Sequence, residues 1–388
     1  MKFSCSQQVL TKAFNIVSKA VTSRTTIPIL KGILLRVSED GILTMSASDL
    51  DLTIEKKLEV EGAEAGEVVV QAKLFGDIIR KLPNSMIHVS EQNTNLLIQC
   101  ANSEFNIVGF AADEFPNIKD NEEITDKIVF ERDLLNDMIK KTSFAASIDE
   151  TRGVITGVLI EMKEEELHMV ALDGFRMAVA REKIRNAKDK DIIIPAKILN
   201  EISKILSESE MEETAVDLYL NPKKAIFLFD DTKVILRLLE GQFVRYEDIL
   251  PKDSQCRVVL NKSDFMNSIE RASLLAKIGK NNLIKLDIKD HNMEITSKSE
   301  EGTVKEEIIV SKEGSDLIIG FNSKYLSDAL SLRRITSVAV SYNPIPFSSS
   351  NFTISSRRKH LFSESTKNWL SPRNIFPNIR HMSLLKLG

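Results

Sequence analysis

The sequence predicts an α+β protein built from three tandem copies of one domain, each with two helices and antiparallel sheets. A motif of apolar strand, polar N-cap region and amphipathic helix occurs three times, in residues 1–21, 126–146 and 256–276. A second strand–turn–helix motif also occurs three times. The lysines that begin its helices, Lys73, Lys197 and Lys324, are 124 and 127 residues apart. Two motifs that recur at nearly one interval indicate a repeated domain rather than a short solenoid repeat.

Strands account for most of the remaining sequence. Between the two helices of each copy, apolar and polar residues alternate with a period of two, which is typical of antiparallel strands with one buried face. These segments are residues 32–60, 157–184 and 283–310. After the second helix, the first two copies contain further predicted strands within residues 86–100, 105–111, 215–220, 225–230 and 234–241. Polar, proline-containing segments then separate the copies, which predicts domains of residues 1–122, 123–252 and 253–388.

Composition excludes several classes of protein. The chain of 388 residues is 43% hydrophobic and 28% charged, which is ordinary for a soluble globular protein. It lacks an apolar run of about 18 residues and a signal peptide, so we expect a cytoplasmic location and no membrane partner. Cys5, Cys100 and Cys256 are too widely spaced for a disulfide framework or a zinc site, and we interpret them as buried hydrophobic residues. We therefore expect no metal and no cofactor.

The predicted helices carry basic side chains although the formal net charge of the chain is −4. At 100° per residue, apolar residues such as Leu10, Phe14, Leu74 and Ile78 form buried stripes. The basic residues on the opposite faces are Lys12, Lys19, Lys73, Arg80, Lys140, Lys197, Lys204 and Arg271. For any single helix, lysine on a solvated face is the simpler explanation. Recurrence on five helices, with acidic residues gathered in the connecting segments, favours binding of a polyanion through its phosphates without sequence readout.

No catalytic constellation is recognisable. The most suggestive segment is residues 171–180, where Asp173 and Arg176 flank Gly174 and Phe175. A turn between two strands explains Asp173 and Gly174 without chemistry, and we favour that interpretation over a catalytic carboxylate. The corresponding place in the first copy keeps an aspartate but lacks the glycine and the arginine, so the second copy has a local feature of its own.

Together, the three divergent copies and several local segments resemble the bacterial DNA polymerase III beta subunit, the sliding-clamp family. The segments are residues 26–30, 111–117, 151–161, 171–180 and 240–251. The resemblance implies a head-to-tail homodimer in which six domains form a ring and twelve helices line its hole. It implies a non-catalytic processivity factor that encircles double-stranded DNA. The implied partners are the replicative polymerase subunit, the clamp loader and other proteins with clamp-binding motifs.

Individual residues carry over from the family. Arg24 matches an arginine that contacts DNA at the face of the ring, and Lys73, Arg80 and Lys197 match basic lining positions. Asp149 stands where the family has a contacting glutamine, and its charge repels phosphate. The resemblance implies a peptide pocket formed by Ile155, Leu172, Gly174, Phe175, Arg176, Met177, Val244, Ile249 and Tyr325. It implies a dimer interface that contains Phe105, Ile107, Leu274 and Leu275.

The C-terminal segment departs from the family pattern from Ser331, so we expect the resemblance to end at about residue 330. From Ser331 onward Glu364 is the only acidic residue, whereas the whole chain has 56. We interpret this segment as the product of a shifted reading frame near codon 330, and an intact frame at codon 331 would exclude that. A true extension is the alternative. On the first interpretation the third domain lacks strands that complete its sheet, which would impair stability and the pocket.

Three classes of function remain. A sliding clamp explains the repeat, the basic helices and the local segments together. A three-domain protein-interaction scaffold that does not encircle DNA would leave the lysine faces merely solvated. A hydrolase using Asp173 is the third class.

Overall fold

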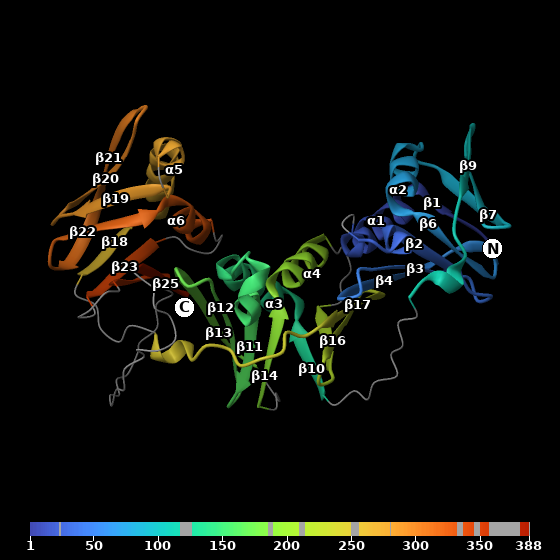
Figure 1. Ribbon diagram of the computed structural model, residues 1–388, viewed down its shortest axis with the longest axis horizontal. Coiled ribbons are helices and arrows are strands. Elements are labelled where there is room, and N and C mark those ends of the chain that lie inside the picture. The colour runs from blue at the N-terminus through green and yellow to red at the C-terminus, as the bar shows by residue number, and fades with distance from the viewer. Residues whose placement is uncertain are drawn as a thin grey trace. The chain divides into compact units, whose positions relative to one another are not determined.

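The structure is a computed structural model with two compact units (Figure 1). It describes residues 1–22, 25–116, 126–184, 189–208, 214–249, 256–279 and 281–331, and the backbone of 337–344, 350–356 and 381–387. Unit 1 comprises Met1–Asn136 and Glu201–Leu238, and unit 2 comprises Asp137–Asn200 and Leu239–Gly388. The predicted second domain therefore contributes strands to both units.

The predicted strand–helix motifs are present in all three copies. In the described part of the chain the helices are α1 (Gln7–Val17), α2 (Ala72–Lys81), α3 (Arg132–Thr142), α4 (Ala196–Glu208), α5 (Lys262–Ile278) and α6 (Ser323–Leu330). Polar side chains cap several of them, as the sequence predicts. The Ser6 hydroxyl accepts a hydrogen bond from the Val9 amide, and the Asn261 and Asn322 side chains accept from the amides of Ser263 and Lys324. Such caps satisfy amide groups that have no partner within the helix.

Unit 1 contains two antiparallel sheets. The larger has the order β10 (Asp126–Glu131), β15 (Ala215–Leu220), β16 (Lys224–Phe229), β17 (Thr232–Arg237), β4 (Leu52–Glu59), β3 (Ile42–Ser48), β2 (Gly32–Val37) and β6 (Gly66–Gln71). The smaller has the order β5 (Glu61–Glu64), β1 (Lys2–Ser6), β7 (Met86–Gln92), β8 (Asn95–Cys100) and β9 (Ser103–Val108). Strands of the second copy thus continue a sheet of the first copy through the antiparallel pair β17–β4.

In the residues that the structure describes, unit 2 contains one sheet of twelve strands. Its order is β14 (Lys190–Pro195), β11 (Gly157–Lys163), β12 (Glu166–Leu172), β13 (Arg176–Lys183), β25 (His381–Leu387), β24 (Ser350–Ser356), β23 (Ser337–Pro344), β18 (Cys256–Asn261), β21 (Gly302–Gly314), β20 (Asn292–Ser299), β19 (Leu283–Ile288) and β22 (Leu317–Asn322). Short 3-10 helices in the chain are η1 (Ser18–Ala20), η2 (Pro28–Lys31), η3 (Ala112–Glu114), η4 (Ser143–Ala145), η5 (Glu150–Thr156) and η6 (Tyr246–Asp248).

The third copy differs from the second in its last strand. The prediction that strands are missing after α6 is wrong, because β23 pairs with β18 and β24 pairs with β23, both antiparallel. In the second copy β17 follows β16 in a tight hairpin and is antiparallel to both of its neighbours, β16 and β4. In the third copy β25 is parallel to both of its neighbours, β24 and β13. The departure from the internal repeat therefore lies at β25 rather than directly after Leu330.

The buried faces mostly follow the predicted stripes. Leu10, Phe14 and Ile78 are buried as expected, but Leu74 is 44% exposed and Phe75 takes the core position instead. The rings of Phe14 and Phe75 lie 6.0 Å apart between centroids. The three cysteines are free and buried, as the sequence predicts. Burial raises the pKa of Cys5 to about 11, which keeps its thiol protonated and unreactive. No helix in the described ranges is long and apolar enough to cross a membrane.

The contact between α1 and α2 depends on Gly76. A Cβ atom at this position would lie 2.3 Å from Cζ of the buried Phe14 ring. Alanine normally favours a helix interior over glycine by about 1 kcal/mol, whereas overpacking a core costs about 1–3 kcal/mol. We therefore expect Gly76→Ala to lower the free energy of unfolding by up to about 2 kcal/mol in urea titrations. The double variant with Phe14→Leu should recover part of that loss, and a stabilised Gly76→Ala protein would contradict the steric argument.

Candidate functional site

The turn between β12 and β13 is organised by Asp173. Its Oδ1 accepts hydrogen bonds from the amides of Phe175 at 2.8 Å and Arg176 at 2.9 Å, and its Oδ2 accepts from Arg176 Nε at 3.0 Å. Gly174 has φ +89°, a left-handed conformation that favours glycine. The predicted turn is confirmed. A carboxylate that is buried and already accepts three hydrogen bonds is poorly suited to act as a nucleophile or base, which argues against the hydrolase interpretation.

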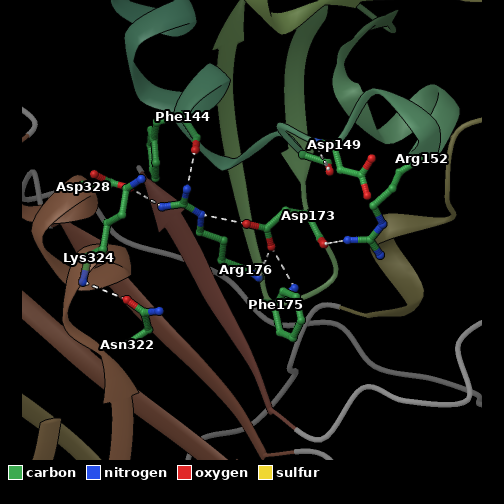
Figure 2. A network of polar contacts seen from close by, with 10 residues as sticks. Phe144, Asp149, Arg152, Asp173, Phe175, Arg176, Asn322, Lys324 and Asp328 are labelled. Carbon is green, nitrogen blue, oxygen red and sulfur yellow. Dashed lines mark hydrogen bonds and ion pairs between the residues drawn. The ribbon is translucent and has the colours of Figure 1, made fainter. Parts of the chain in front are cut away.

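Arg176 connects three segments of unit 2 (Figure 2). Besides Asp173, its Nη1 donates to Asp328 Oδ2 on α6 at 2.6 Å, and its Nη2 donates to the carbonyl oxygen of Phe144 at 2.7 Å. The guanidinium carbon lies 4.4 Å from the ring centroid of Tyr325 and 5.4 Å from that of Phe144. The Arg176 side chain is buried. Arg176 holds the β12–β13 turn, the Phe144 backbone and α6 together.

Arg152 is a residue that the sequence argument missed. Its Nη1 donates to the carbonyl oxygen of Asp173 at 2.6 Å, and its Nη2 lies 3.1 Å from where a Cβ of Gly174 would be. It belongs to η5, which Asp149 caps by accepting from the Thr151 amide and hydroxyl. These hydrogen bonds from Thr151 lower the pKa of Asp149, so the carboxylate stays charged. The available signal in the sequence was an arginine three residues before Ile155, on the other side of the kink at Gly153.

The apolar residues of the predicted peptide pocket lie together on one face of the β11–β14 sheet. Ile155, Leu172 and Met177 belong to a buried cluster that also contains Leu159, Val170, Val179, Ile193 and Tyr246. Val244 and Ile249 are partly buried against this cluster. Phe175 is 49% exposed, and its ring centroid lies 6.4 Å from that of the half-buried Tyr325. The predicted pocket residues thus include a buried apolar cluster and, outside it, the exposed ring of Phe175 beside Tyr325.

The basic residues predicted to contact DNA lie on the helices, and most are exposed. Exposed members are Lys12, Lys73, Arg80, Lys140, Lys197, Lys204 and Arg271. Several form ion pairs: Lys19 with Glu208 at 3.4 Å, Lys204 with Glu201 at 2.7 Å, and Arg271 with both oxygens of Glu306. Arg80 lies 5.0 Å above the Phe14 ring and 3.3 Å from Asp77. Arg24 lies outside the described residues. Arg271 has the most strongly engaged guanidinium, so a phosphate would have to compete with Glu306.

The predicted dimer residues divide into exposed and buried members. Phe105 is exposed on β9, whereas Ile107 is only 8% exposed and its side chain offers little surface to another chain. Val108, which is 75% exposed, is the neighbouring apolar residue that the sequence argument did not include. On α5, Leu274 is 64% exposed and Leu275 is half-buried. Both elements therefore present apolar side chains to solvent.

Three family models match the chain in order. They describe the N-terminal, central and C-terminal domains of the DNA polymerase III beta subunit and match residues 1–119, 130–244 and 247–359. The chain belongs to the DNA polymerase III beta subunit family. The match of the C-terminal domain extends past Leu330 and ends at residue 359. The segment after residue 359 lies outside the matched domains.

Relatives of known name and structure belong to the same family of sliding clamps. The beta sliding clamp of Bacillus subtilis (strain 168) is 36% identical over 356 residues, which cover 88% of this chain and 93% of the relative. A beta sliding clamp of Staphylococcus epidermidis is 37% identical over 341 residues, covering 85% and 89%. The crystal structures of the DNA polymerase sliding clamp from Bacillus subtilis and the DNA polymerase III beta subunit from Thermotoga maritima match with TM-scores of 0.80 and 0.81, at 36% and 27% identity. Each match covers 88% of this chain and 92% of the chain in the crystal structure.

Proposed function

We propose that this chain is a DNA sliding clamp, a non-catalytic processivity factor that encircles duplex DNA as a head-to-tail homodimer. The observation that carries this proposal is the match of all three clamp domains, in order, over residues 1–359. A ring holds DNA by topology, so tight phosphate contacts are not needed and would hinder sliding. The exposed helix lysines of an otherwise acidic chain suit weak contacts of this kind.

The same proposal assigns partners to the surfaces described above. The predicted peptide pocket receives extended segments of the replicative polymerase subunit, the clamp loader and other clamp-binding proteins, with leucine or phenylalanine side chains as anchors. The exposed apolar residues of β9, including Phe105 and Val108, meet α5 of a second copy around Leu274. The protein acts in the cytoplasm, at the nucleoid during replication.

A topology assay tests the ring. The chain is loaded on nicked circular DNA with a bacterial clamp loader and ATP, then washed in about 1 M salt, where the Debye length is about 3 Å. We expect the protein to stay on the circle and to leave after the circle is cut once. Retention that does not depend on topology would favour the scaffold or an ordinary DNA-binding protein.

A matched variant checks that retention needs a closed dimer. Leu274→Glu places a charge on an exposed apolar residue, so the fold should persist while the interface is weakened. We expect this variant to sediment as a monomer and to lose retention on the circle. Normal retention by a monomeric Leu274→Glu variant would contradict the proposed ring.

A further inference from the structure

One chain segment covers the sheet face on which the predicted peptide pocket lies. In residues 239–249, Leu239, Phe243, Val244 and Ile249 are partly buried against the apolar cluster, and Tyr246 is buried within it. The Leu239 amide donates to the carbonyl oxygen of Ile193 on β14 at 2.9 Å. Val244 and Ile249, which belong to the predicted pocket, thus lie on either side of Tyr246 in the sequence.

Tyr246 reaches a polar pair at the edge of this apolar cluster. Glu161 on β11 and His168 on β12 are direct cross-strand partners. The Tyr246 hydroxyl donates to Glu161 Oε2 at 2.7 Å and lies 2.9 Å from His168 Nδ1. His168 Nδ1 is also 3.2 Å from Glu161 Oε2, and Nε2 lies 2.9 Å from Glu166 Oε2. The phenol, the imidazole and the two carboxylates therefore form one connected network.

Burial and hydrogen bonding fix the positions of the side chains in this network. Glu161 and His168 have side chains that are mostly shielded from water, and hydrogen bonds are stronger where the local dielectric constant is low. Burial, and then the hydrogen bond to Glu161, raise the pKa of the Tyr246 phenol, so it remains a donor throughout the physiological range. The hydrogen bond from His168 lowers the pKa of Glu166, which keeps this outer carboxylate charged.

We propose that Tyr246, Glu161 and His168 are positioning residues that fix residues 239–249 so that Val244 and Ile249 line the peptide pocket. The inference rests on the proposed function of that pocket. The three residues act through the segment and do not touch the peptide. The 3-10 turn η6 makes the coupling direct, because the Ile249 amide donates to the Tyr246 carbonyl oxygen at 3.1 Å. A shift of the Tyr246 ring would therefore displace the wall residues on both sides of it.

Peptide binding by the full chain tests this role. The probe is a fluorescein-labelled hexapeptide that ends in leucine and phenylalanine, and its control has alanine at both positions; fluorescence polarisation gives the affinities. Tyr246→Phe removes only the hydroxyl. Because only part of the lost hydrogen bond to a charged group is passed on to the pocket, we expect this variant to weaken binding of the probe by about five- to tenfold. Tyr219→Phe removes a similar hydroxyl, which donates to Asp217 at 3.3 Å on β15, and should leave the affinity unchanged.

A pair of Glu161 variants separates positioning from general stability. Glu161→Ala removes the acceptor of the Tyr246 hydroxyl and should weaken the probe to the same extent, whereas Glu161→Gln keeps an acceptor and should restore most of the affinity. Melting temperatures are measured for every variant. Affinity changes below twofold in both the Tyr246→Phe and the Glu161→Ala variant would overturn the proposal. Unfolding of unit 2 in both of these variants would also overturn it. If the unchanged chain does not distinguish the two peptides, it is the proposed pocket that fails.

Discussion

Replacing Arg176 with alanine is expected to lower the free energy of unfolding of unit 2 by about 3–5 kcal/mol, the usual cost of breaking a buried ion pair from one side. The guanidinium donates to Asp173, Asp328 and the Phe144 carbonyl oxygen, and its carbon lies 4.4 Å and 5.4 Å from the ring centroids of Tyr325 and Phe144. Its removal would leave both carboxylates in a shielded site without their cation. Urea unfolding followed by circular dichroism, with hydrogen exchange to identify the unit, measures the change.

Two variants test whether the shape of the guanidinium matters. Arg176→Lys keeps the charge, but a lysine cannot donate in three fixed directions. We therefore expect Arg176→Lys to be destabilised nearly as much as Arg176→Ala. Arg257→Ala is the matched control in the same unit, because Arg257 pairs at 3.5 Å with the exposed Glu313. Such pairs contribute less than about 1 kcal/mol. Equal effects of Arg176→Ala and Arg257→Ala would show that the buried network adds nothing to stability.

The sequence predicts the repeated architecture well because its signals are local. Caps such as Ser6 and Asn322, the alternation within strands, and the turn at Asp173 and Gly174 each depend on neighbouring residues. Leu74 shows where a helical pattern of apolar residues predicts the wrong buried residue. Leu74 and Phe75 are adjacent, so the pattern permits either at the core position, and packing against Phe14 selects the aromatic ring. That choice depends on a contact between two helices about sixty residues apart, which periodicity does not contain.

The clustering of some predicted pocket residues could be expected from the sequence, but the geometry around them could not. Ile155, Leu172 and Met177 do come together, yet the orientation of Arg176 is decided by Asp328, which lies 152 residues further along the chain. Arg152 and Tyr246 contribute through contacts of the same long-range kind. In the C-terminal segment, the amino-acid composition changes at Ser331. The strand directions, however, depart from the internal repeat only at β25. The shifted reading frame remains a hypothesis, and strand direction favours a junction later than codon 330.

The second large loss of stability is expected when Asp230, in the β16–β17 turn of unit 1, is replaced. Its Oδ1 contacts Arg132 Nη2 at 2.6 Å, and both side chains are almost fully buried. Its carbonyl oxygen accepts from Lys56 Nζ on β4. Burial lowers the pKa of Lys56 more than the neighbouring Asp231 and Asp230 raise it. In unit 1, the buried ion pair between Arg132 and Asp230 therefore lies beside the contact of Lys56 with Asp230, which joins the first copy to the second. In unit 2, Arg176 in the same way joins the second copy to the third.

Asp230 also has φ +45°, so the choice of variant decides what is measured. Asparagine tolerates this conformation and keeps the shape of the side chain, whereas alanine adds backbone strain. We expect Asp230→Asn to lower the free energy of unfolding of unit 1 by about 2–3 kcal/mol, and Asp230→Ala by about 3–5 kcal/mol. Asp231→Asn is the matched control, because Asp231 has φ +55° in the same turn but an exposed side chain.

Comparing the two Asp230 variants separates charge from conformation. If Asp230→Asn behaves like Asp231→Asn while Asp230→Ala remains strongly destabilised, the turn conformation matters and the ion pair with Arg132 does not. If both Asp230 variants are strongly destabilised, the buried charge pair stabilises unit 1 directly. Hydrogen exchange adds an independent reading: loss of the pair should speed exchange of the β17 and β4 amides, whose antiparallel pairing joins the two copies. Exchange confined to the turn itself would contradict a role in holding the copies together.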